Sequence, residues 1–356
     1  MKKNKAYKLT LLICGGTVLL GIILMISGIL MGGTPSFYID YKNHEVRTLS
    51  DVLIEKEIET DDFDSMEVDS YYGDVFIQEG TSYRVSYAAS EHFEPTVTVT
   101  DGTLSIKQPE QNHFNFDFTI FSFQDFNLGF GNHGFRAKGN EYLLITVPSG
   151  TELKNLSAST GSGDLTIHDI HADTITANDA FGAITLDNLS SSKLFVDADT
   201  GSVSLKSAIV DELTIENSFG KTTLEDVQGN KLHADSDSGD ISGNNVSFEH
   251  AEFQCSFGNV SLQSSTFDEL LASLNSGDFE FQSLSALDTV IDSAFGDVNG
   301  SFDGTESDYM LDLETDFGSI HIDGDGLGNL YQSRTTADKK ITITMDSGDI
   351  DISFTN

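Results

Sequence analysis

Apolar and polar residues alternate over most of the chain after residue 150, and a glycine recurs inside this pattern. Eight of these glycines are each 19 residues apart, and two looser copies follow at longer intervals. The ten positions are Gly163, Gly182, Gly201, Gly220, Gly239, Gly258, Gly277, Gly296, Gly318 and Gly348. An outlying copy, Gly73, lies far upstream. A fixed period of this length is the signature of a repeat architecture.

The residues around each glycine are also regular. The second and fourth residues after it are mostly apolar; after Gly163 they are Leu165 and Ile167. The seventh and fifth residues before it are mostly apolar too; before Gly201 they are Leu194 and Val196. Apolar residues spaced by two predict β-strands with one buried face. A single unit cannot bury that face alone, but stacked units can. We therefore predict an all-β fold, with a parallel β-solenoid over residues 151–356 whose glycines are structural turn residues.

The residue before the glycine alternates between Ser or Thr and Phe, which gives a second, doubled period. Two explanations fit this alternation. In the first, each coil spans one glycine interval, and large and small side chains of successive coils interdigitate in one stack. In the second, each coil spans two intervals and has two glycine corners. We favour the shorter coil, with one glycine interval per turn of the solenoid.

The N-terminal part predicts a membrane anchor. Four lysines in residues 1–8 precede an uncharged stretch at 9–31, long enough for a helix to cross the bilayer. All 57 acidic residues but only 15 of the 19 basic ones follow it. Basic flanks stay cytoplasmic, so we expect the rest of the chain outside the cell membrane, on a single-pass protein. Residues 32–59 are then a linker, and 60–150 an N-terminal β cap.

A Phe-rich insertion at 112–135 lies within the predicted cap. It contains eight Phe in 24 residues, among them Phe118, Phe121, Phe123 and Phe126. One interpretation is a hairpin packed on the solenoid as core. The other is an exposed loop in which these four Phe contact the membrane or a partner protein.

Composition and candidate chemistry narrow the function. A formal net charge of −38 argues against nucleic-acid binding, which depends on Lys and Arg. Aspartates follow several repeat glycines, including Asp164 and Asp278, and could bind calcium, but turn residues are the favoured interpretation. The His168/His171 pair lacks a third ligand, and Cys255 fits a small buried position. We expect no cofactor, no metal and no catalytic residue.

The Ser-Gly-Asp-apolar and Phe-Gly-Asp-apolar units follow a strand that ends Ile145-Thr146-Val147-Pro148. Together they resemble the "putative adhesin" family of domains of unknown function, which is common in membrane proteins of Gram-positive bacteria. The resemblance implies a β-solenoid and, for some members, a link to cell-envelope stress responses.

These observations predict a membrane-anchored, extracytoplasmic β-solenoid. Its expected role is a non-catalytic interaction or stress-sensing module of the cell envelope. Its expected partners are the membrane, through the anchor, and other envelope or small membrane proteins. The alternatives are a surface adhesin that binds a host or wall ligand and a carbohydrate-active β-helix enzyme.

Overall fold

The computed structural model describes residues 21, 24, 27, 37–40, 45–48, 53–90, 93–109, 141–333 and 336–355. The chain divides into two compact units. One comprises Met1–Val52 with Glu110–Asn132, and the other Leu53–Pro109 with His133–Asn356. Most of the predicted anchor, and the Phe-rich insertion with Phe118, Phe121, Phe123 and Phe126, lie outside the described residues.

In the first unit, the strands β1 (Phe37–Asp40) and β2 (Glu45–Thr48) pair antiparallel. Residues 21, 24 and 27 are helical. No helix within the described part of the chain is both long and apolar enough to cross a bilayer. The transmembrane helix at 9–31 therefore stays a prediction.

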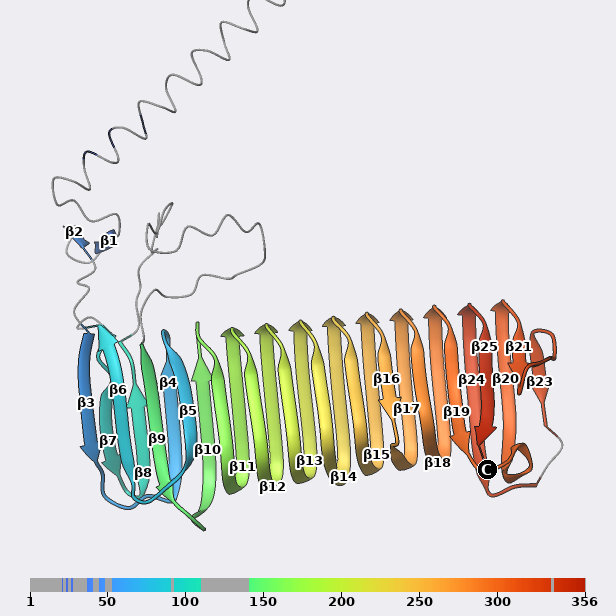
Figure 1. Ribbon diagram of the computed structural model, residues 1–356, viewed down its shortest axis with the longest axis horizontal. Coiled ribbons are helices and arrows are strands. Elements are labelled where there is room, and N and C mark those ends of the chain that lie inside the picture. Colours follow the sequence, from blue (N-terminus) through green and yellow to red (C-terminus); the bar gives the residue numbers. More distant parts are fainter. Residues whose placement is uncertain are drawn as a thin grey trace, which may run out of the picture. The chain divides into compact units, whose positions relative to one another are not determined.

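The second unit is a stack of parallel rungs, which run through green, yellow and orange in Figure 1. Each rung pairs with the rung one glycine interval further along the chain, as Leu165 does with Ile184, and Ile184 with Val203. A coil therefore spans one glycine interval, which excludes the longer coil with two glycine corners and confirms the all-β stacked fold. The rungs are β11 (Leu165–Phe181), β12 (Ile184–Thr200), β13 (Val203–Phe219), β14 (Thr222–Ser238), β15 (Ile241–Phe257), β16 with β17 (Val260–Gln263, Thr266–Ser276) and β18 (Phe279–Phe295).

Alternation of buried and exposed residues fills one core inside the stack. In β11 the side chains of Leu165, Ile167, Ile170 and Ile175 are all fully or almost fully buried, and the same positions are buried in the following rungs. At about 25 cal/mol per Å² of apolar surface, each such Leu or Ile contributes about 1.5–3 kcal/mol. Burial of this continuous stripe is what holds the rungs together.

The N-terminal strands of this unit begin the stack. The outlying Gly73 copy is the neighbour of the first repeat in space, because Val75 pairs in parallel with Leu165. The hairpin turn at Asp101 and Gly102 has φ of 52° and 77°, as a tight two-residue turn requires. The strands are β3 (Leu53–Glu59), β4 (Ser65–Ser70), β5 (Asp74–Gly80), β6 (Arg84–Ser90), β7 (Thr96–Thr100), β8 (Thr103–Lys107), β9 (Tyr142–Pro148) and β10 (Glu152–Thr160).

At the C-terminal end, spatial order differs from sequence order. The last strands, β24 (Lys339–Ser347) and β25 (Ile350–Thr355), insert between the preceding two layers, as Figure 1 shows. Short antiparallel strands then cover the outer layer, which leaves less free strand edge. The remaining elements are β19 (Val298–Asp303), the 3-10 helix η2 (Glu306–Asp308), β20 (Tyr309–Phe317), β21 (Ile320–Ile322), β22 (Asp325–Gly326) and β23 (Leu330–Gln332).

Candidate functional site

The glycines form one corner of the solenoid, and their spacing is set by backbone contact. A Cβ built on Gly201 would lie 1.6 Å from the carbonyl oxygen of Gly182, and one on Gly220 would lie 1.8 Å from that of Gly201. Gly201 also has a φ of +149°, which side-chain-bearing residues rarely adopt. All ten predicted glycines occupy this corner, together with Gly73. We call it the glycine edge.

The aspartates that follow these glycines accept backbone hydrogen bonds between rungs. The Asp278 carboxylate accepts the N–H of Asp297 at 2.8 Å, and the Asp297 carboxylate accepts that of Asp349 at 2.9 Å. Asp164 accepts the N–H of Ala183 in the same way, at 3.0 Å. These contacts give the aspartates a structural role that does not need calcium. The described residues contain no group of three or more His, Cys, Asp or Glu side chains that could hold a metal ion.

Polar side chains lie beneath the glycine edge, three residues before most of these glycines. The Ser236 hydroxyl donates to the Gly239 carbonyl at 3.0 Å, and the Thr315 hydroxyl donates to that of Gly348 at 2.9 Å. Cys255 is buried in this column, as predicted, and burial raises the pKa of its thiol to about 11. The hydroxyl groups of this column therefore stabilise the glycine edge through hydrogen bonds to its carbonyl groups. Cys255 stays a protonated thiol and is not a reactive thiolate.

Asp179 belongs to the same buried column. Only 3% of its surface is exposed, and its Oδ1 accepts the Phe181 N–H at 3.0 Å. Burial raises the pKa of this carboxyl to about 6, and the nearby carboxylates of Asp164 and Asp199 act in the same direction. Asp179 is thus a buried acid that changes charge near neutral pH.

Five exposed phenylalanines project from the glycine edge, one immediately before every second glycine. Their exposed fractions range from 59% to 78%. They are Phe181, Phe219, Phe257, Phe295 and Phe317. We call these five the phenylalanine row. Each is the last residue of its strand, and these strands end in the arrowheads at the upper edge of the stack in Figure 1. Exposed apolar side chains that gather on one surface, unlike ones scattered singly, mark candidate interaction sites.

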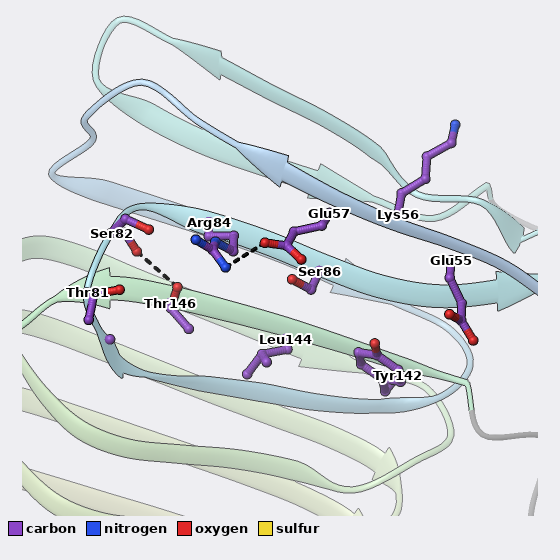
Figure 2. A pocket seen from close by; sticks show the side chains of 11 residues that line it. Glu55, Lys56, Glu57, Thr81, Ser82, Arg84, Ser86, Tyr142, Leu144 and Thr146 are labelled. Carbon is purple, nitrogen blue, oxygen red and sulfur yellow. Dashed lines mark hydrogen bonds and ion pairs between the residues drawn. The ribbon is translucent and has the colours of Figure 1, made fainter.

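A pocket of about 620 Å³ lies elsewhere, on the outer face of β3, β6 and β9. Figure 2 shows Arg84 directed at Glu57, with a separation of 2.5 Å; a second carboxylate, Glu59, lies 3.7 Å from the guanidinium. The Thr146 hydroxyl donates to the Ser82 carbonyl at 3.0 Å. Lys56 points away from this pair and bonds Glu94. Both basic residues that line this pocket are therefore already ion-paired.

A second groove, of about 320 Å³, follows one side of β13 to β15 and β17. Side chains of neighbouring rungs contact one another across it: Lys231 lies 3.4 Å from the Glu212 carboxylate, and the Nδ1 atom of His250 lies 2.8 Å from the Glu269 carboxylate. Lys193 approaches Glu212 to 2.9 Å and, with Lys231, lowers the pKa of that carboxyl. The lysine that lines this groove is therefore already ion-paired.

The predicted site residues fall in different places. The repeat glycines converge on one edge, whereas the four Phe of the insertion lie outside the described residues and stay a prediction. His168 lies beside Asp169 at 2.9 Å and Asp187 at 3.3 Å, on the rung surface. The phenylalanine row is missing from the predicted site residues, because alternation of Phe with Ser or Thr was interpreted as packing. The signal for the row in the sequence is the alternation of Phe with Ser or Thr before the glycines from Gly163 to Gly296.

The chain is similar to one family model and to several solved structures. The family model described as Toastrack DUF4097 matches residues 63–242 and 193–353. Structural neighbours include a putative adhesin from Bacteroides fragilis (14% identity, TM-score 0.34, 86% of this chain and 99% of that one). Others are a putative lipid binding protein from Parabacteroides distasonis (13%, 0.34, 85% and 97%) and a putative cell adhesion protein from Clostridium sporogenes (12%, 0.19, 85% and 99%).

A search of curated proteins gives no match. The family model, by contrast, extends over most of the chain, from the first strands of the stack to its last rung. The chain therefore belongs to the Toastrack DUF4097 family, a group of domains of unknown function.

Proposed function

We propose that this protein is a membrane-anchored, extracytoplasmic binding module of the cell envelope, with an interaction or stress-sensing role and no catalysis of its own. The observation that carries the proposal is the phenylalanine row. The rungs bury their apolar residues inside the stack, yet these five aromatic side chains remain exposed on one edge. A rigid rod with a periodic apolar edge is suited to binding extended partners.

The anchor and the location are supported by the N-terminal sequence. Lysines in residues 1–8 followed by the apolar stretch 9–31 fit a single-pass helix with a cytoplasmic N-terminus. The acidic charge of the remaining chain favours solubility outside the membrane. A surface adhesin that binds a host or wall ligand is the same arrangement with a different partner, and it is our second candidate.

Topology reporters test the anchoring. Alkaline phosphatase fused after residue 356 is active only outside the cytoplasm, so we expect activity in the membrane fraction of a bacterial host. Deletion of residues 1–33 should abolish both the activity and the membrane association. A cytoplasmic reporter that is active at the same fusion point, with an inactive phosphatase, would contradict the proposed location.

Crosslinking in intact cells tests the binding role. A photoreactive amino acid replaces Phe219, which is 59% exposed on the glycine edge, or Ile209, which is 55% exposed elsewhere on the same strand. We expect adducts with an envelope component from position 219 and far fewer from position 209. Equal crosslinking from both positions would mean that the row has no binding role.

A further inference from the structure

We propose that the phenylalanine row binds an extended, basic polypeptide segment in the polyproline II conformation. This inference rests on the proposed function, because it names the partner of that binding module. The row's regularity is the first support. Thr200, Ser238, Ser276 and Ser347 separate the five Phe, so a small side chain stands between successive exposed rings.

The C-terminal rungs show that this alternation holds in space and not merely along the chain. In sequence, Phe317 is the next corner after Phe295, which would place two rings on neighbouring rungs. In the structure β24 lies between them, and Ser347 pairs with both Phe295 and Phe317. The alternation of Phe with a small residue along the glycine edge therefore continues at the C-terminal end, where the spatial order of the strands differs from their order in the sequence.

The spacing of the rings selects the conformation of the partner. Rungs lie about 4.8 Å apart, so successive Phe rings are about 9.6 Å apart. A polyproline II helix has three residues per turn at about 3.1 Å each, or about 9.3 Å per turn. A β-strand returns to the same face after about 6.7 Å, and an α-helix after about 5.4 Å. Of these three conformations, only polyproline II has a repeat length that matches the distance between successive rings.

Over the four intervals of the row, the accumulated difference for polyproline II is only about 1.2 Å. Every third residue of such a segment can therefore enter a slot between two rings, above a Ser or Thr. Aromatic-lined grooves recognise Pro-rich segments in this way, and a preformed helix loses little conformational entropy on binding. A segment of about 13 residues covers the row.

The charge next to the row selects a basic partner. Exposed acids precede the glycine by two residues on three of the four small-residue rungs that separate the rings, namely Asp199, Asp237 and Asp346. The aspartates that follow the glycines border the other side, among them Asp240 and Asp278. Each slot therefore has at least one carboxylate beside it, which a Lys or Arg once per turn can meet, although one basic residue, Lys221, also lies on this edge. A second copy of this chain would bring acids against acids.

The test uses the full-length protein in detergent and a fluorescent peptide, (Pro-Pro-Lys)5, whose binding is followed by anisotropy. We expect saturable binding that weakens with salt. Phe257→Ser should lower the affinity about tenfold, because a contact of one Phe with the peptide is lost. Phe219→Ser with Phe257→Ser should lower it further. Ile209→Ser, a matched exposed apolar residue, should leave it unchanged.

Matched peptides separate conformation from charge. (Gly-Gly-Lys)5 carries the same charge on a flexible backbone and should bind at least tenfold more weakly, because its ordering costs entropy. (Val-Lys)7 has a two-residue period and should also bind weakly, and (Pro-Pro-Glu)5 should not bind. Equal binding of the two five-lysine peptides would overturn the polyproline II assignment.

The remaining outcomes also decide between partners. Light scattering that shows a dimer of the wild-type protein, lost in Phe257→Ser, would overturn the proposal in favour of a second copy. Adducts from position 219 in cells, without binding of (Pro-Pro-Lys)5, would overturn this inference and leave the proposed function intact. Peptide binding without any adduct in cells would support the site's chemistry and contradict the proposed function.

Discussion

Each rung turns sharply at two kinds of corner, and the two differ in what they tolerate. At the glycine edge, neighbouring backbones approach so closely that a Cβ would lie about 2 Å from a carbonyl oxygen. At the second corner, six residues after each glycine from Gly163 to Gly277, the chain turns through a left-handed residue with φ of 50–56°. This residue is Asp169, Asn188, Ser207, Asp226, Asn245, Ser264 or Ser283 in successive rungs.

At the glycine edge, the residue type is restricted because there is no room for a Cβ atom. At the second corner, it is restricted only by the left-handed backbone conformation. Short polar residues occupy the left-handed region at modest cost, and their side chains can bond the next rung. The Asn245 amide, for example, donates to the Asp226 carboxylate at 2.6 Å. Three residue types therefore serve at the second corner, whereas only glycine serves at the first.

The largest effect should come from filling the glycine edge. Gly201→Ala places a methyl group 1.6 Å from the Gly182 carbonyl oxygen, and neither backbone can move without breaking the stack. We expect a loss of more than about 3 kcal/mol in unfolding free energy. Ser207→Gly, at the other corner of the same rung, should change it by less than about 1 kcal/mol. Urea unfolding of the two variants measures this, and equal losses would contradict the distinction.

A smaller, pH-dependent effect should come from the buried acid beneath the glycine edge. The pKa of Asp179 is about 6 in the folded protein, above the ordinary value of 3.8. Its contribution to stability is therefore greatest below pH 4 and is lost as pH rises through 6. Asp179→Asn should gain up to about 3 kcal/mol over the wild type at pH 7.5.

Urea unfolding at pH 4 and pH 7.5 checks this prediction. At pH 4 the wild-type carboxyl is mostly protonated, so D179N and the wild type should differ little. An advantage of the variant that is the same at both pH values would show that the carboxyl does not titrate in the folded protein as described.

The second corner should respond to loss of its side chain by about 1 kcal/mol. Asn245→Ala keeps the left-handed backbone, φ 56°, but removes the amide that bonds Asp226. Asn245→Gly removes the same bond and relieves the backbone, so it should cost less. Thermal melting of the pair separates the two contributions, and a larger loss for glycine than for alanine would count against a left-handed corner.

The smallest effect should come from the aspartates of the glycine edge. Asp278→Ala removes the acceptor of the Asp297 N–H, a bond of 2.8 Å near solvent. We expect a loss of about 0.5 kcal/mol, since the bond lies near solvent and the equivalent position holds Ala183 in another rung. Added calcium should leave the melting temperature of the wild type unchanged. A calcium-dependent rise that Asp278→Ala removes would instead show a metal role for these residues.

The rung itself was predictable because its rules are local. The regular glycine spacing and the paired apolar positions such as Leu165 and Ile167 determine the repeat and its buried face. The place of Gly73 was not predictable, because a long stretch of chain with other strands separates it from its neighbour Gly163. The reversed order of the last rungs depends in the same way on long-range pairing. The second corner did have a signal in the sequence, namely Asp, Asn or Ser six residues after each glycine from Gly163 to Gly277.

The outward orientation of the side chains in the phenylalanine row was also not predictable from the alternation of buried and exposed residues in a strand. Phe181 has the same parity along its strand as Ala177 and Asp179, which are buried, so alternation predicts an inward side chain. The chain already turns towards the glycine at this point, and Phe181 is 65% exposed instead. Alternate residues face the same side only while the strand stays straight, so the rule does not apply to the residue next to a corner.

The most direct test of the account compares two phenylalanines of the same strand, β15. Phe253 is fully buried, whereas Phe257 is 60% exposed in the phenylalanine row. If the row is surplus to folding and available to a partner, Phe257→Ser should change the unfolding free energy by less than about 1 kcal/mol. Phe253→Ser should cost at least about 3 kcal/mol. Comparable losses in urea unfolding would make Phe257 part of the core and contradict the binding role of the row.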